Sequence, residues 1–264
     1  MKEVTLMKKF FALTLAALLL LCSMSISAFA ASESVTVYVS ISDKGSLAVA
    51  QKKVTVTDID GDGSLTVNDA LYAAHEAAYS GGAASGYGYY SHKDYGLSLG
   101  KLWGDTSENF GYYLNNKSCW SLADAVKNGD YLNAFVYSDG KYYSDKYCFF
   151  DVYTVEADAN SDIELTLSYA GYDAAWNPVT LPLEGAEITV DGKATGVKTD
   201  ANGKAVIQID GNGTYVISAS GSSLTLVPPV CTAEINGSSV IEAILSAIAS
   251  LISGIISLIV SLFA

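Results

Sequence analysis

The sequence predicts a mainly β, multidomain chain: an α+β module, then a β-sandwich, then a hydrophobic C-terminal helix. Three observations support this prediction. Residues 33–155 hold several runs of alternating apolar and polar residues around one helical run, residues 158–230 hold only short alternating runs between glycine turns, and residues 240–264 are almost uncharged. Alternation at period two is typical of half-buried strands, whereas a 3.6-residue period indicates a helix.

The N-terminus reads as a secretory signal over residues 1–30. Three lysines precede the apolar run Phe10–Leu21, and a small-x-small cleavage site follows at residues 28–30. The sequence therefore predicts a protein that is exported to the cell surface.

Composition excludes one class of partner. The chain of 264 residues has 15 basic residues, all of them lysine, against 28 acidic residues, and its net charge is −13. Without arginine or a basic stripe we expect no nucleic-acid binding. A strong negative charge suits a soluble extracellular surface in contact with calcium.

In the first module, strands are expected at Ser34–Ser42 and Val54–Ile59, and a helix at Val67–Tyr79. Glycines in Gly81–Gly88 predict a break after the helix. Further strands are expected at Gly111–Leu114, Tyr131–Tyr137 and Tyr147–Val155, with turns at Asn115-Asn116 and Asp139-Gly140. Together they predict an α+β module.

A twelve-residue acidic segment, Asp58–Asp69, lies between the second strand and the helix. It fills each ligand slot of a calcium loop, with glycine at position 6 for the sharp turn. The predicted Ca²⁺ ligands are Asp58, Asp60, Asp62, Ser64 (by its carbonyl), Thr66 and Asp69. The alternative is an acidic surface turn that binds no metal.

This loop resembles EF-hand loops, in particular those of dockerin modules, which carry Asp at position 12. Dockerins pair two loops and this chain has one, so the resemblance implies calcium binding rather than cohesin docking.

Three segments of the first module carry a second resemblance. They are Asp69–Leu71, Phe110–Lys117 and Val126–Tyr131. They resemble the helix start, hairpin and turn of the transcobalamin-like C-terminal domain family. The resemblance implies a β-grasp-type fold, and it suggests binding of cobalamin or a related small ligand as an alternative function.

In the second module, strands are expected at Ile163–Tyr169, Ala186–Val190, Lys204–Ile209 and Gly213–Ser218. The segments Pro182–Ile188, Thr199–Ala205 and Gly213–Tyr215 resemble hairpins of prealbumin-like, collagen-binding B-type surface sandwiches. The resemblance implies a stalk or spacer.

The C-terminal segment Ala243–Ala264 is long enough to cross a bilayer as a helix. We expect a membrane anchor; the alternative is a helix packed on the protein's own surface. Its serines form one stripe, which suggests a homo-oligomer through close helix contact: Ser246, Ser250, Ser253, Ser257 and Ser261.

Cysteines and histidines leave few chemical options. Cys119 and Cys148 are either a disulfide or two buried free thiols. His75 has no second histidine at zinc-site spacing, and is expected on the helix surface. No nucleophile elbow or phosphate-cradling loop is present, so we expect no enzyme.

Most of the 18 tyrosines fall in the first module. Paired aromatics on a strand place one ring on each face. We expect a recognition face that includes Tyr113, Trp120 and Tyr143; the alternative is packing in the core and along sheet edges.

These features predict an exported bacterial surface protein in which a calcium-stabilised binding or adhesion module stands on a sandwich spacer. Its ligand would be an extracellular protein or glycan. Besides the small-ligand binder, the other alternative is a structural, oligomerising component of the cell envelope.

Overall fold

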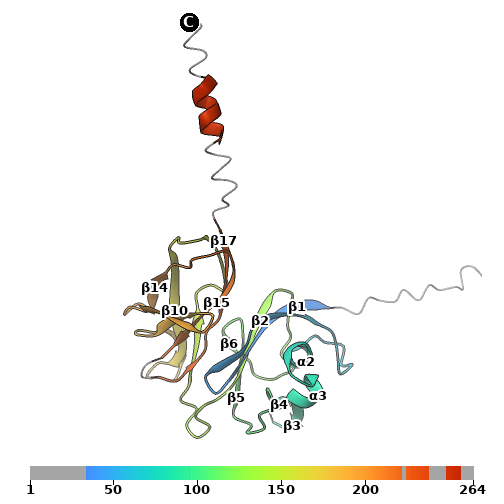
Figure 1. The fold of residues 1–264 in the computed structure, drawn as a ribbon. Coiled ribbons are helices and arrows are strands. Elements are labelled where there is room, and N and C mark those ends of the chain that lie inside the picture. Colours follow the sequence, from blue (N-terminus) through green and yellow to red (C-terminus); the bar gives the residue numbers. More distant parts are fainter. Residues whose placement is uncertain (1–33, 95, 222–223, 238–247, 257–264) are drawn as a thin grey trace, which may run out of the picture.

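The computed structural model describes residues 34–94, 96–221, 224–237 and 248–256 (Figure 1). Within these residues the chain is mainly β, as predicted, and its strands form several sheets. The expected signal peptide, residues 1–30, lies outside the described residues, as does most of the expected C-terminal helix.

The first sheet has the strand order β2-β1-β7-β5-β6. Its strands are β1 (Val35–Asp43), β2 (Ser46–Val56), β5 (Phe110–Leu114), β6 (Lys117–Ser118) and β7 (Asp130–Val136). β1 and β7 are parallel, and the other neighbours are antiparallel. Asn115 and Asn116 form the β5–β6 turn with φ of 50° and 61°, which confirms the predicted Asn-Asn turn.

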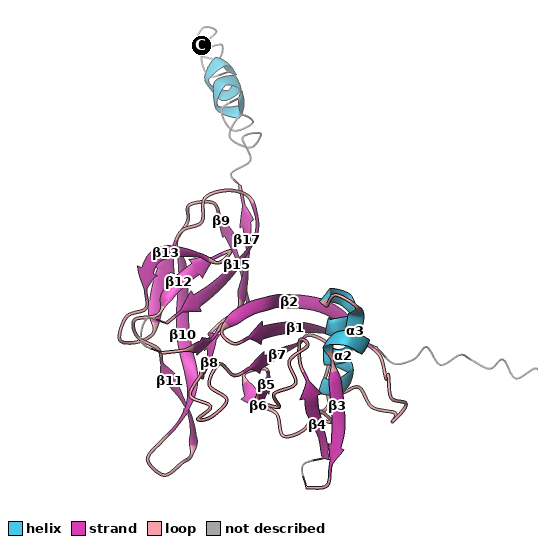
Figure 2. Ribbon diagram, turned by 60° about the horizontal axis from the view of Figure 1, so that its bottom comes forward, coloured by secondary structure: helices cyan, strands magenta, loops and turns pink. Residues whose placement is uncertain are grey.

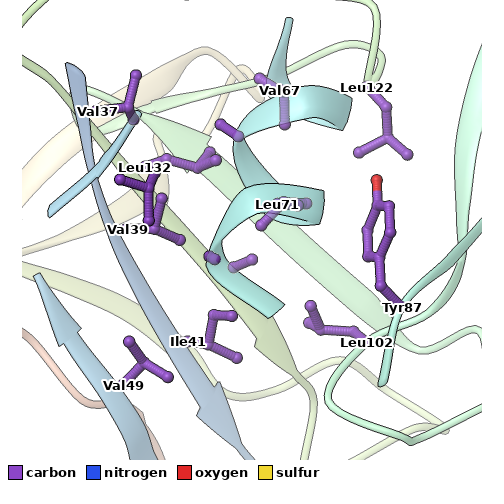
Figure 3. Close-up of a cluster of buried hydrophobic side chains, with 14 of the residues drawn as sticks. Val37, Val39, Ile41, Val49, Val67, Leu71, Tyr87, Leu102, Leu122 and Leu132 are labelled. Atoms are coloured by element: carbon purple, nitrogen blue, oxygen red, sulfur yellow. The ribbon is translucent and has the colours of Figure 1, made fainter. Parts of the chain in front are cut away.

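The predicted helix is confirmed as α2 (Val67–Ala78). Ala70, Leu71 and Ala74 form its buried stripe, and they belong to one core with Ile41 of β1 and valines of β1 and β2 (Figure 3). Full burial of a side chain such as Leu71 contributes about 1.5–3 kcal/mol. The helix is therefore held by packing against the sheet.

The predicted break at residues 81–88 contains a short helix, α3 (Gly82–Gly86). It is followed by a separate hairpin of β3 (Gly88–His92) and β4 (Gly96–Lys101), seen beside α2 in Figure 2. The sequence did not predict these elements, because their glycines are typical of loops. These elements and the first sheet, residues 35–136, are called the helix-bearing part below.

The remaining strands, residues 146–236, are called the all-strand part. They are β8 (Lys146–Phe150), β9 (Thr154–Asp158), β10 (Ile163–Tyr172), β11 (Pro178–Pro182), β12 (Glu187–Val190), β13 (Lys193–Lys198), β14 (Lys204–Ile207), β15 (Gly213–Ser220), β16 (Leu226–Val227) and β17 (Cys231–Asn236). One sheet has the order β11-β10-β8-β16, with β14 also paired to β10, and the other has β13-β12-β15-β17-β9.

Both sheets of the all-strand part bury their inner residues in one core. Leu165 and Leu167 come from β10, and Ile188, Ile217 and Ile235 from the other sheet. The strand expected at Tyr147–Val155 is two strands, β8 and β9, and each pairs only within this part. The change of sheets therefore comes before residue 146 rather than after residue 155.

The disulfide considered for Cys119 and Cys148 does not form. Cys119 packs against the core of the helix-bearing part, whereas Cys148 is buried in the core of the all-strand part. Both are free thiols, as is Cys231. The chain thus follows the second alternative, with Cys148 buried and Cys119 partly buried.

Aromatic side chains join the two parts. Phe135 of β7, Tyr147 of β8 and Val227 of β16 are buried in a third cluster. Hydrogen bonds also join the two parts, because Gln51 of β2 donates from Nε2 to the carbonyl oxygens of Tyr153 (2.9 Å) and Val230 (3.1 Å). Its Oε1 accepts from the Thr232 hydroxyl at 2.6 Å.

Residues 248–256 are helical, and Leu251 in this segment is 65% exposed. No helix among the described residues is long and apolar enough to cross a membrane.

Candidate functional site

The acidic loop, Asp58–Asp69, connects the end of β2 to α2. Gly61 and Gly63 have φ of 76° and 85°, a left-handed backbone that favours glycine. The end of the loop is fixed to another segment of the same part, because the backbone N–H of Val67 donates to the carbonyl of Asp124 at 2.9 Å. The loop therefore makes a tight turn, and its C-terminal end is held in place by this hydrogen bond.

Asp58 holds the turn from inside. Its Oδ1 accepts from the backbone N–H of Gly61 (2.7 Å) and of Asp62 (3.2 Å), and its Oδ2 accepts from that of Gly63 (2.9 Å). These hydrogen bonds, that from Gly63 first, lower the pKa of the Asp58 carboxyl. The carboxylate is therefore ionised and oriented.

Asp69 closes the loop from the helix. It is fully buried, and forms a capping box with Thr66 in which Asp69 Oδ2 accepts from the Thr66 backbone N–H at 2.8 Å. Its other oxygen, Oδ1, accepts from the backbone N–H of Ile59 at 2.9 Å. One carboxylate thus ties the first residues of the loop to its last.

Asp60 is exposed, but its Oδ2 accepts from the side-chain amide of Asn68 at 3.0 Å. Desolvation raises the pKa of the Asp60 carboxyl, and the charges of Asp62 and Asp69 raise it further. Repulsion of this kind disfavours a second and third carboxylate at one place unless a cation balances them.

Three of the predicted ligands lie together. Oxygens of Asp58, Asp60 and Asp69 lie within 4.8 Å of one another. None of the ion pairs formed by the described residues involves these carboxylates. A set of oxygen ligands without His or Cys suits a hard cation such as Ca²⁺, so the residues present fit that ion.

The other predicted ligands have different partners in the structure. Asp62 Oδ1 accepts from the backbone N–H of Ser64 at 2.8 Å. The Thr66 hydroxyl donates to Asp69 Oδ2 at 2.6 Å, since Thr66 is the N-cap of α2. In this structure Thr66 therefore acts as the N-cap of α2.

Sequence reasoning missed Asn68. It is fully buried, and besides its bond to Asp60 it accepts at Oδ1 from the Tyr87 hydroxyl at 2.7 Å. The available signal was an asparagine in the first turn of a helix, a position where its amide can reach back to the preceding loop.

His75 was expected on the helix surface, and this was wrong: it is fully buried. Its Nδ1 lies 2.7 Å from the Leu71 carbonyl, and its Nε2 accepts from the backbone N–H of Trp103 at 3.0 Å. The first contact needs a proton on Nδ1 and the second needs none on Nε2, so the ring is neutral. Burial lowers its pKa accordingly.

The three predicted recognition residues lie in different settings. Tyr113 is partly buried and stacks on Tyr147 with ring centroids 3.7 Å apart. Tyr143 is 51% exposed and donates from its hydroxyl to Asn109. Trp120 is 75% exposed in the turn after β6.

A groove of about 380 Å³ lies between the β5–β6 and β10–β11 hairpins, and is called the inter-hairpin groove below. Among its lining residues are Tyr113, Lys117, Ser118, Phe149, Tyr172 and Thr180. Of the three predicted recognition residues, Tyr113 lines it. Sequence reasoning missed Tyr172 and Thr180, because the strand expected at Ile163–Tyr169 ended before Tyr172 and β11 was not predicted.

A scan against protein-family models found no match for this chain, and a search of curated proteins found no similar sequence.

Proposed function

We propose that this protein is a calcium-stabilised binding protein of the cell surface. One observation carries the proposal: the Asp58, Asp60 and Asp69 carboxylates converge within 4.8 Å on a loop that leads into a packed helix. Calcium bound there would relieve the repulsion among the carboxylates. It would also fix the junction between β2 and α2.

The choice of Ca²⁺ follows from ligand chemistry. The converging atoms are carboxylate oxygens, and Ca²⁺ accepts six to eight oxygen ligands in flexible geometry. Mg²⁺ demands near-ideal octahedral geometry and releases its waters reluctantly, so a loop that supplies most of the ligands itself suits Ca²⁺ better. The remaining ligands would be Asp62, the Ser64 carbonyl, Thr66 and water, as the sequence pattern implies.

The binding role is supported by the arrangement of the chain. A mixed sheet with one packed helix is compatible with the β-grasp-like module that the transcobalamin-like resemblance implies, and two sheets on one core are compatible with a sandwich spacer. We propose two domains on this basis. Export and attachment through the C-terminal segment are proposed from the sequence of residues 1–30 and 243–264.

Thermal unfolding of the purified protein in calcium and in chelator tests the proposal. With a Kd of about 10⁻⁴ to 10⁻³ M, calcium at about 5 mM should stabilise the fold by about 1–2 kcal/mol, or roughly 2–8 °C. The same concentration of magnesium is the control. An unchanged melting temperature in calcium would contradict the proposal.

A further inference from the structure

The β10–β11 hairpin exposes two large aromatic rings next to the inter-hairpin groove. Tyr172, which lines the groove, is 63% exposed, and Trp176 is 80% exposed. Their ring centroids are 6.1 Å apart and their planes are inclined by 47°, so the two rings form one angled aromatic surface. Rigid aromatic side chains of this kind provide a large contact area at a small entropic cost.

The tip that carries these rings is ordered by Asp173. Its Oδ1 accepts from the backbone N–H groups of Ala175 and Asn177, both at 2.8 Å, and its Oδ2 accepts from the Asn177 side chain at 2.9 Å. Within this tip Trp176 has φ of 62°, a left-handed conformation that a bulky residue rarely adopts. The tip therefore presents its rings in a fixed position before any ligand arrives.

The groove itself combines aromatic surface with neutral polar groups. Tyr113 is held by its stack on Tyr147, and Ser118 and Thr180 are exposed. None of the described residues that line the groove is acidic, although the chain has a net charge of −13. Its volume of about 380 Å³ falls within the usual range of small-molecule sites.

The edge of β11 disfavours an extended peptide as the occupant. The backbone N–H of Leu183 donates to the carbonyl of Leu167. In this antiparallel register, the backbone N–H and C=O groups of every second residue of β11, Leu181 and Val179, therefore face β10. The backbone groups of Pro178, Thr180 and Pro182 therefore face the free edge of the strand. Of these three residues only Thr180 has a backbone N–H that could donate to an added strand. Prolines at outward positions of an edge strand prevent the addition of another strand.

An anionic ligand is also disfavoured. The overall negative charge repels it, and Lys117 is the one basic residue among the described residues that line the groove. A ligand with many neutral hydroxyl groups and apolar C–H faces matches what remains. The C–H faces would pack on the rings, while hydroxyl groups would bond to the exposed serine, threonine and lysine side chains.

We propose that the inter-hairpin groove binds a neutral oligosaccharide, with Tyr172 and Trp176 as the aromatic platform and Lys117, Ser118 and Thr180 as hydrogen-bonding partners. This inference rests on the proposed binding function and specifies its ligand class and its site.

The test is affinity electrophoresis of the protein in gels that contain a neutral polysaccharide, followed by calorimetry with the corresponding hexasaccharide. The probes are β-glucan, xylan, galactomannan and soluble chitin oligomers, with polygalacturonate as the anionic control. The variants are Tyr172→Ala and Trp176→Ala. Tyr142→Ala is the matched control, because Tyr142 is 71% exposed, does not line the groove and lies outside the β10–β11 hairpin.

We expect at least one neutral probe to bind, Tyr172→Ala and Trp176→Ala each to weaken that binding about tenfold, and Tyr142→Ala to leave it unchanged. The proposal is overturned if no neutral probe binds, if only polygalacturonate binds, or if Tyr172→Ala and Trp176→Ala both bind like the unaltered protein. Melting temperatures in calcium and in chelator are measured on the same samples. A calcium shift without sugar binding then contradicts this inference alone, and sugar binding without a calcium shift contradicts only the proposed calcium site.

Discussion

The side-chain amide of Asn68 donates a 3.0 Å hydrogen bond to Oδ2 of Asp60, and thereby links a buried residue of α2 to an exposed residue of the acidic loop. The same amide accepts from the Tyr87 hydroxyl at 2.7 Å. Tyr87 belongs to the core that α2 shares with the first sheet. The position of a predicted calcium ligand is thus set by the packing of the helix-bearing part.

Replacement of Asn68 by Ala should weaken calcium binding and also destabilise the fold. The variant releases Asp60 and leaves the buried Tyr87 hydroxyl without this partner, which costs about 1–3 kcal/mol. Calorimetric titration with calcium and urea unfolding in chelator measure the two effects. Tyr87→Phe is the matched control: it removes the hydroxyl but keeps the bond to Asp60, so it should leave calcium affinity unchanged. Equal affinities of Asn68→Ala and the unaltered protein would refute the positioning role.

Asp60→Asn should have opposite effects with and without calcium. In chelator it removes a carboxyl whose pKa is raised by desolvation and by the charges of Asp62 and Asp69, so the melting temperature should hold or rise. In calcium it removes a ligand, so affinity should fall about tenfold or more and the variant should melt below the unaltered protein.

Asp69→Asn provides the contrast to that variant. Asp69 is buried and accepts from Thr66 and Ile59, so its loss should destabilise the protein by about 1–2 kcal/mol even in chelator. Differential scanning calorimetry of Asp60→Asn and Asp69→Asn distinguishes a residue that acts only as a calcium ligand from one that also caps the helix. Identical behaviour of the two in chelator would contradict this division of roles.

Stability should fall as the pH decreases below about 6.5, because His75 is buried and neutral. The pKa of His75 is lowered in the folded state, so in this range the unfolded chain binds a proton that the folded chain does not. The contribution of neutral His75 to the stability of the fold is fully present above the unfolded-state pKa of about 6.5, and it is lost progressively as the pH falls below that value.

Melting temperatures between pH 5.5 and 7.5 in chelator check this, with His75→Asn and His92→Asn compared. The pH dependence of the melting temperature should be reduced in His75→Asn and retained in His92→Asn. A dependence that survives unchanged in His75→Asn would assign it to other groups.

The three described thiols should react slowly in the folded protein. Burial raises the pKa of Cys119, Cys148 and Cys231 to about 12 each, so little thiolate is present at neutral pH. Labelling with a thiol reagent should be slow in buffer and complete in denaturant without reductant. Protection of Cys119 and Cys148 in denaturant would indicate the disulfide that the structure lacks.

Local sequence patterns correctly predicted those features whose conformation depends on residues close by in the sequence. The spacing of Asp58, Asp60 and Asp69 predicted their convergence, and Asn115-Asn116 predicted a tight hairpin, because each depends on residues of one short continuous segment. The burial of His75 was not predictable in this way, since its partner Trp103 comes from a distant segment.

The inter-hairpin groove was beyond local patterns for the same reason. β11 contains two prolines, which argue against a strand, and it forms only as an edge of the sheet that β10 builds with β8. Likewise, Tyr113 looked like an exposed residue of a strand, but its ring stacks on Tyr147 from the other part of the chain.

Gln51 should stabilise the junction of the two parts, and Gln51→Ala should cost about 1–3 kcal/mol. The variant removes two bonds from Nε2 to the carbonyls of Tyr153 and Val230, and one accepted from Thr232. Gln208→Ala is the control, because Gln208 Nε2 makes one exposed bond, to Asp162 at 2.7 Å, and its loss should be nearly neutral. Urea unfolding gives the energies, and hydrogen exchange should show faster exchange in β9 and β17 for Gln51→Ala alone. If both variants unfold alike, the junction does not depend on Gln51.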